Sequence, residues 1–135
     1  MDRWLAISDG AVAALHALAY AYSTGGPVSA RGAAEEIGVS PTYLAKLVQE
    51  LARAGLAEVS RGATGGFALA GDAHKVNALD VVRAVDGALP VRFCLFPESA
   101  CRSGTCRLKA LCDQIATEAE AGLKDMSIAE LAESY

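Results

Sequence analysis

The sequence lacks any apolar run long enough to span a membrane, contains no repeats, and has few aromatic residues, at 6% of 135 positions. A spanning helix needs about 18 or more apolar residues in succession, so we expect no membrane partner. The first residues, 1–6, lack the basic segment and long apolar run of a secretory signal. We therefore expect a cytoplasmic protein whose cysteines do not form disulfides.

The sequence also lacks the motifs that most enzymes carry. We find no phosphate-binding loop, no nucleophile elbow and no pair of carboxylates on a shared face, so we expect no enzymatic activity. There are two histidines, and His16 is interpreted as a structural residue of a helix rather than a ligand. The net charge of −4 disfavours a nonspecific nucleic-acid binder. Any DNA binding must therefore come from a local patch of positive charge.

Apolar residues make up 53% of the chain, and alanine is frequent. A chain of this length can bury a single hydrophobic core, and this composition is typical of a mostly helical protein. Ser8 is expected to cap a first helix that ends near Tyr22. The apolar positions expected on one face of that helix are Ala11, Val12, Leu15, Leu18, Ala19 and Tyr22.

The next segment has the pattern of a helix-turn-helix. Ser29 is expected to cap a helix over 30–37, and Gly38 ends it. Ser40 and Pro41 are a capping residue and a first-turn proline for a helix over 41–54. The apolar positions of this second helix follow helical spacing and are Leu44, Leu47, Val48 and Leu51. Two helices joined by a short turn around a glycine form a helix-turn-helix.

A hairpin is expected directly after the second helix. Residues 56–60 and 67–69 are predicted strands, and R-G-A-T-G-G lies between them. A helix-turn-helix followed by such a hairpin is typical of a winged helix. We expect its second helix to enter the major groove of DNA and Arg61 to contact the adjacent backbone or minor groove. The alternative is a purely structural helical hairpin with a β-ribbon.

Three further helices are predicted. Asn77 is expected to cap one that ends at Asp86, and Ser127 one over 128–132. Between them, 107–124 forms a long helix with its own apolar stripe, interpreted as a dimerisation helix. The stripe comprises Leu108, Leu111, Cys112, Ile115, Ala119, Gly122 and Leu123. The predicted fold is mainly α with a small β-hairpin: a winged helix-turn-helix domain over 1–75, then a cysteine loop and dimerisation helix over 76–135.

All four cysteines lie within 94–112, with spacings of six, four and five residues and no C-x-x-C pair. Tetrahedral zinc sites and thioredoxin-like dithiols favour tighter pairs. Cys94, Cys101 and Cys106 lie in a segment with the loop pattern of Pro, Ser and Gly, where soft thiolates suit an iron–sulfur cluster. Redox-active thiols and inert cysteines are the alternatives.

Three stretches together resemble a known family. These are V-S-P-T-Y-L-A-K-L-V-Q-E-L-A-R-A-G-L-A-E-V-S-R-G-A-T-G-G-F-A-L-A at 39–70, N-A-L-D-V-V-R-A-V-D-G at 77–87, and M-S-I-A-E-L at 126–131. With the three cysteines, they resemble the winged-helix iron–sulfur regulators typified by IscR and NsrR. The resemblance covers nearly the whole chain. It implies a homodimeric bacterial transcription regulator that binds a palindromic operator in double-stranded DNA.

Residue by residue, the resemblance implies that Cys94, Cys101 and Cys106 hold the cluster (4Fe–4S or 2Fe–2S). It also implies that Ser40, Thr42, Tyr43 and Arg61 contact DNA, with Gly62 in the wing. The positive charges expected beside them are Arg31, Lys46 and Arg53. Where IscR-like members place a histidine ligand, a discriminating glutamate and a basic second residue, this chain has Lys109, Ala45 and Asp2.

The fourth ligand is therefore open. The resemblance to NsrR-like members implies Asp9, supplied to the partner subunit's cluster. Cys112 is the other candidate, although six residues of helix beyond Cys106 turn it towards the apolar stripe. A water, a small thiol or no ligand is the third possibility.

The sequence is compatible with two functions. The first is a DNA-binding regulator whose operator affinity depends on the cluster, with nitric oxide, redox state or iron supply as the signal. The second is a cluster-free regulator in which the same cysteines act as a thiol switch or bind a partner protein.

Overall fold

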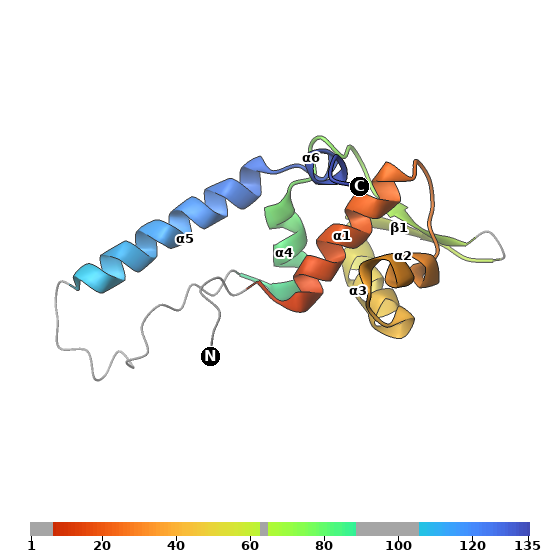
Figure 1. The fold of residues 1–135 in the computed structure, drawn as a ribbon, viewed down its shortest axis with the longest axis horizontal. Helices are drawn as coiled ribbons and strands as arrows, with labels where there is room; N and C mark the ends of the chain where they lie inside the picture. The colour runs from red at the N-terminus through yellow and green to blue at the C-terminus, as the bar shows by residue number, and fades with distance from the viewer. Residues whose placement is uncertain (1–6, 63–64, 89–105) are drawn as a thin grey trace.

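The computed structural model describes residues 7–62, 65–88 and 106–135. The segment that holds Cys94 and Cys101, and the second residue Asp2, lie outside the described residues. The helices and strands run in the order predicted (Figure 1). They are α1 (Asp9–Ser23), α2 (Ala30–Ile37), α3 (Pro41–Arg53), β1 (Ala57–Ser60), β2 (Gly66–Leu69), α4 (Ala78–Asp86), α5 (Arg107–Asp125) and α6 (Ile128–Ala132).

The predicted capping residues begin their helices. A capping side chain accepts a hydrogen bond from a first-turn amide that has no partner within the helix. In each case the donor is the backbone N–H three positions further on. These residues are Ser8, Ser29, Ser40, Asn77 and Ser127. The predicted helix starts are confirmed, and the ends and strand starts differ from prediction by no more than one residue.

Helices α2 and α3 form the predicted helix-turn-helix. Gly38 ends α2 in a left-handed conformation with φ of 82°, which glycine adopts without steric cost. Its N–H donates to the Ala34 carbonyl at 2.9 Å. Three residues later Pro41 opens α3, so the turn has the length that the sequence indicates.

The wing is a two-stranded antiparallel sheet of β1 and β2, with Val59 opposite Phe67. On its other edge β2 bridges to Val28, whose N–H and carbonyl both bond to Phe67 at 2.9 and 2.8 Å. This contact requires glycine at position 66, because a Cβ there would lie 2.3 Å from the Val28 carbonyl oxygen. The chain entering α2 is thereby fixed to the wing.

The core lies around α1, which packs against α2, α3, α4, α6 and β2. Its many alanines let these helices approach closely; Ala11, Ala14 and Ala17 have no exposed surface. The predicted face of α1 is only partly correct, because Val12 and Tyr22 are 42% and 40% exposed. Neighbours on several sides bury the alanines instead, so the buried surface of α1 is broader than one stripe.

Helices α4 and α6 belong to the same core, and α5 extends away from it (Figure 1). Val81 of α4 and Ile128 of α6 are fully buried in one cluster with Leu18 and Leu51. The α6 start is fixed by an N–H of Ile128 that donates to the Val76 carbonyl at 2.9 Å. Residues on both sides of the predicted boundary at 75 and 76 thus contribute to one core, and the two-part division stays a prediction.

None of the helices among the described residues has the length and apolar character that crossing a membrane requires.

Candidate functional site

The exposed face of α3 presents polar side chains at helical spacing. Leu44, Leu47, Val48 and Leu51 are buried, as predicted. On the opposite face lie Thr42, Lys46 and Arg53, all exposed. Thr42 and Arg53 are eleven positions apart, which is about 16 Å along a helix axis. A row of this length matches several base-pair steps of a major groove.

Gln49 lies on the same exposed face, and the sequence analysis missed it. It follows Thr42 by seven positions and Lys46 by three, so the helical spacing already indicated its place. A glutamine amide has both a donor and an acceptor and can pair with the N6 and N7 edge of adenine. Gln49 therefore joins the candidate base-contacting residues.

Ser40 and Tyr43 both lie at the start of α3. The Ser40 hydroxyl oxygen accepts from the Tyr43 N–H at 3.2 Å, which leaves its own hydrogen available to a phosphate oxygen. Tyr43 is 41% exposed. Its hydroxyl lies against α1, since a Cβ on Gly10 would be 2.8 Å from that oxygen. Tyr43 thus lies between the exposed face and the core.

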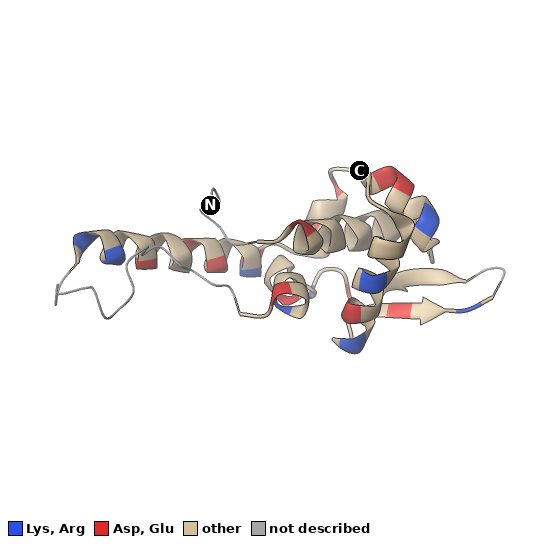
Figure 2. Cartoon of the chain, turned by 90° about the horizontal axis from the view of Figure 1, so that it is seen from below, with Lys and Arg blue, Asp and Glu red and all other residues tan. Residues whose placement is uncertain are grey.

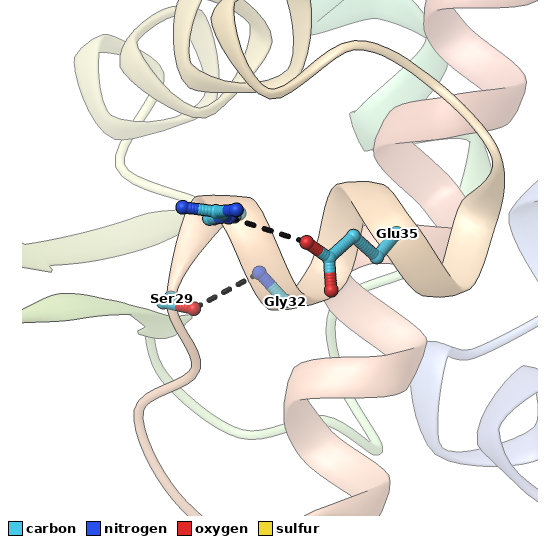
Figure 3. A network of polar contacts seen from close by, with 4 residues as sticks. Ser29, Gly32 and Glu35 are labelled. Carbon is cyan, nitrogen blue, oxygen red and sulfur yellow. Dashed lines mark hydrogen bonds and ion pairs between the residues drawn. The ribbon is translucent and has the colours of Figure 1, made fainter.

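Arg31 lies in the first turn of α2. The capping residue of this helix, Ser29, accepts from the Gly32 N–H at 3.0 Å (Figure 3). The Arg31 Nε donates to Glu35 Oε1 at 3.2 Å, and the two side chains are 82% and 68% exposed. An ion pair this exposed contributes roughly 0–1 kcal/mol to stability. Arg31 can exchange Glu35 for a phosphate at little cost.

Arg61 and Gly62 follow β1 and are both exposed. They lead into the wing tip, whose next two residues are outside the described part of the chain. The wing therefore carries one described cation, Arg61, at the end of an anchored sheet. In a winged helix, a guanidinium at this position can reach the backbone or groove beside the one that holds the second helix of the helix-turn-helix.

The charge of this region differs from that of the whole chain. Residues 30–69 contain four basic and four acidic residues, whereas the chain carries −4. In Figure 2 basic and acidic positions are interspersed over the molecule rather than gathered on one side. Residues 30–69 thus have no net charge of their own, and the cations that they could present to DNA are Arg31, Lys46, Arg53 and Arg61.

Two cysteines are described, both in or beside α5. Cys106 is the residue that precedes α5; it is partly buried, and its side chain makes no capping hydrogen bond. Cys112 is 6% exposed. This agrees with the interpretation of Cys112 as an apolar residue of the helix rather than an outward-facing ligand.

Asp9 is the first residue of α1 and is exposed. Directly before it, the Ser8 backbone N–H donates to Asp86 Oδ2 at 2.8 Å, and the Ser8 hydroxyl donates to Asp86 Oδ1. The start of α1 is therefore held against the end of α4, from which the chain continues into the cysteine segment (Figure 1).

No group of three or more His, Cys, Asp or Glu side chains suited to one metal ion occurs within 7–62, 65–88 and 106–135. A cluster site would thus need cysteines beyond these ranges. His16, at mid-helix in α1, contacts the Tyr135 hydroxyl through its Nδ1. Partial burial raises the pKa of Tyr135, and the negative charge of Glu36 adds to this. This pair joins α1 to the residues that follow α6.

The chain matches one protein-family model, Rrf2, described as an iron-dependent transcriptional regulator, over residues 7–134. Among curated relatives, the transcriptional regulator IscR of Vibrio campbellii is 31% identical over 111 residues. That match covers 82% of this chain and 66% of the relative, slightly under two thirds of its length.

Two solved structures are similar over almost all of the chain. CymR, the global cysteine regulator of B. subtilis, superposes with a TM-score of 0.79 at 26% identity, covering 96% of this chain and 97% of that one. T. potens IscR superposes with a TM-score of 0.72 at 27% identity, covering 95% and 86%. The similarity therefore includes the long helix as well as the winged helix.

Proposed function

The chain belongs to the Rrf2 family of transcription regulators, and we propose that an iron–sulfur cluster held at its cysteine segment controls its affinity for an operator. The family and the winged helix make it a DNA-binding regulator rather than an enzyme. The operator, the cluster and the assembly into a homodimer are proposals.

The DNA-binding proposal places α3 in the major groove and Arg61 beside it. Thr42, Lys46, Gln49 and Arg53 form the exposed row of α3. Ser40 and Arg31 are positioned to contact phosphates, and Tyr43 and Gly62 to line the edges of the interface. Two such heads reading a palindrome must be spaced by about one DNA turn, which requires a rigid dimer.

The dimer proposal rests on α5. Of its 19 residues only Cys112 is buried, while Leu108 and Leu111 are 60% and 52% exposed. Leucines this exposed, three positions apart on one helix, favour an intermolecular contact. A second copy of α5 provides the same apolar stripe, so the contact is self-complementary.

The cluster proposal rests on Cys106. Its thiol lies at the start of a 19-residue helix, partly buried and not used for capping. Cys94 and Cys101 precede it at a spacing that allows three thiolates to surround one centre. When bound with a carboxylate or open fourth position, the cluster supplies a labile iron that responds to nitric oxide, oxygen or iron supply.

We propose Asp9 of the partner subunit as the fourth ligand. The burial of Cys112, at 6% exposure, disfavours a ligand role for it in this conformation, whereas Asp9 is exposed at the start of α1. Lys109, which stands where related proteins place a histidine, is an amine that does not ligate iron while protonated.

Anaerobic purification followed by visible absorption, iron and sulfide counts and native mass spectrometry tests the cluster. We expect coloured protein, and colourless protein after replacement of Cys94, Cys101 or Cys106 by Ala. Cys112→Ala is the matched control and should keep its colour. A chromophore that is lost with Cys112→Ala but retained with Asp9→Ala would reverse the assignment of the fourth ligand.

The second candidate function is a cluster-free thiol switch. It is favoured by the similarity to CymR, which is described as a global cysteine regulator. Colourless anaerobic protein whose operator affinity changes on thiol oxidation would support this function and contradict the first.

A further inference from the structure

One side chain in the exposed row of α3 differs from the others in its hydrogen-bonding groups. The row consists of Thr42, Lys46, Gln49 and Arg53. Lysine and arginine side chains only donate, whereas a glutamine amide has an acceptor oxygen and a donor NH2 side by side. In the major groove, adenine is the base whose edge has an acceptor, N7, next to a donor, N6. Gln49 is therefore the member of the row whose chemistry matches adenine.

The residues around Gln49 leave room for its amide and place two cations beside it. Its neighbours on a helix surface lie three and four positions away. Ala45 and Ala52 are too short to cover the glutamine side chain, and Lys46 and Arg53 are exposed. The ion pairs found among the described residues use other cations: Arg31, Lys75, Arg83 and Lys109. Lys46 and Arg53 are thus available to hold phosphates on either side of Gln49.

The opposite face of α3 fixes the position of Gln49. Leu47, Val48 and Leu51 are at most 4% exposed, and close packing leaves such residues little freedom to move. Gln49 directly follows Val48, so its backbone belongs to this anchored part of the helix. Reading a base edge requires a side chain that is held at a constant depth in the groove. The packing of α3 meets this requirement at position 49.

We propose that Gln49 determines operator specificity by pairing with one adenine in each half-site, while Lys46 and Arg53 bind phosphates beside it. The glutamine NH2 donates to adenine N7, and the glutamine oxygen accepts from adenine N6. The inference rests on the proposed DNA-binding function and names the base that α3 selects. It involves neither the cysteine segment nor the cluster.

The operator is first obtained by selection from a pool of randomised duplexes with the anaerobically purified wild-type chain. We expect an adenine in each half-site whose replacement weakens wild-type binding by about 5–150-fold. In Gln49→Ala the same replacement should have no effect. This variant should unfold at the same denaturant concentration as wild type, because position 49 is exposed and alanine favours a helix.

Two measurements distinguish a base contact from a phosphate contact. A 7-deaza-adenine nucleotide lacks N7 but keeps its base pair, so it should weaken wild type and leave Gln49→Ala unaffected. Gln49→Ala should keep the salt dependence of binding, because an amide neutralises no phosphate. Lys46→Ala should lower the slope of log affinity against log salt by about one. An equal fall of the slope in both variants would assign Gln49 to the DNA backbone and overturn the inference.

A change of specificity is the strictest test. The carboxylate of Gln49→Glu accepts but does not donate, which matches the N4 amino group of cytosine rather than adenine. The ratio of affinities for operators with adenine and with cytosine at that position should therefore invert. General repulsion of DNA by the added charge cancels in this ratio. Gln114→Glu adds the same charge at an exposed position of α5 and should keep the wild-type ratio.

The outcomes separate this inference from the proposed function. If no sequence is enriched in the selection, the proposed DNA-binding function fails and this inference fails with it. If an operator is enriched but Gln49→Ala discriminates between bases as wild type does, only the inference fails. A preference of Gln49→Glu for adenine over cytosine equal to that of wild type also contradicts the inference alone.

Discussion

Helices α3 and α5 differ in how completely the rest of the described chain covers their apolar residues. In α3, 13 residues long, the four leucine and valine positions of the apolar face are buried. In α5, 19 residues long, one residue is buried, and its first two leucines are more than half exposed. The apolar face of α3 is thus covered within one chain, whereas the described part of the chain buries Cys112 of α5 and leaves Leu108 and Leu111 exposed.

The difference extends to how each helix begins. α3 starts with a serine that caps it and a proline at its first position. α5 starts at Cys106, whose side chain makes no capping contact. A helix without a cap and with few buried residues depends on contacts from elsewhere. The two regions therefore differ in the way that the proposed roles require, with DNA contact proposed for α3 and assembly for α5.

The largest effect is expected from a change that removes the proposed α5 contact. Leu108→Glu with Leu111→Glu places two charges in the apolar stripe and should give a monomer by analytical ultracentrifugation. Operator affinity should fall by roughly 10²–10⁴-fold, because two linked half-site contacts become one. Ala110→Glu adds a charge to the opposite face of the same helix and should leave the dimer intact. A dimeric double variant would show that α5 does not assemble the protein.

A core substitution in the winged-helix region should lower the stability of the fold rather than its assembly. Leu18→Ala, at a fully buried position of α1, should lower the free energy of unfolding by about 2–5 kcal/mol. This loss should not depend on protein concentration. Leu111→Ala, at a 52% exposed position, should destabilise in a concentration-dependent way, because its contact is intermolecular. Denaturant titrations at two concentrations distinguish these cases, and equal behaviour of the two variants would remove the proposed difference between the regions.

The loss of a wing contact should have a smaller effect than the loss of the α5 contact or of core packing. Arg61→Ala removes the described cation of the wing and should weaken operator binding by about 1–3 kcal/mol if it reaches base edges. Lys75→Ala, which removes an exposed cation outside the proposed interface, is the control and should bind normally. Titration by fluorescence anisotropy at matched salt measures both. Unchanged affinity of Arg61→Ala would exclude a direct wing contact at that residue.

The smallest effect concerns the cap of α6. The Ser127 backbone N–H donates to Glu130 at 2.8 Å, and this hydrogen bond, with the one from the Ser127 hydroxyl, lowers the pKa of Glu130 below its ordinary 4.5. A lowered folded-state pKa stabilises the fold above about pH 4.5, and this contribution is lost as the pH falls through the lowered value. Wild type should therefore lose slightly more in Tm between pH 7 and pH 3 than Glu130→Gln does. Glu133→Gln is the control, and equal losses in wild type and Glu130→Gln would contradict the role of this cap.

The sequence by itself determined where the helices begin and what kind of protein this is. The side chains of Ser29, Ser40 and Ser127 each accept a hydrogen bond from the backbone N–H three positions further on. Because this interaction is local, the helix start can be predicted without knowledge of the fold. The apolar spacing of α3 likewise indicated its buried side. The family resemblance rested on contiguous motifs of the same local kind.

Only the tertiary structure decided how these elements meet. The contacts of Ser8 with Asp86 and of Gly10 with Tyr43 join residues far apart in the chain. The packing around α1 also leaves Val12 exposed, against the prediction from its helical spacing. Such contacts depend on which faces pack together, and helical periodicity indicates a face but not its partner. Asp86 illustrates the limit: its position at the end of a helix is locally unfavourable, and a contact 78 positions away compensates for it.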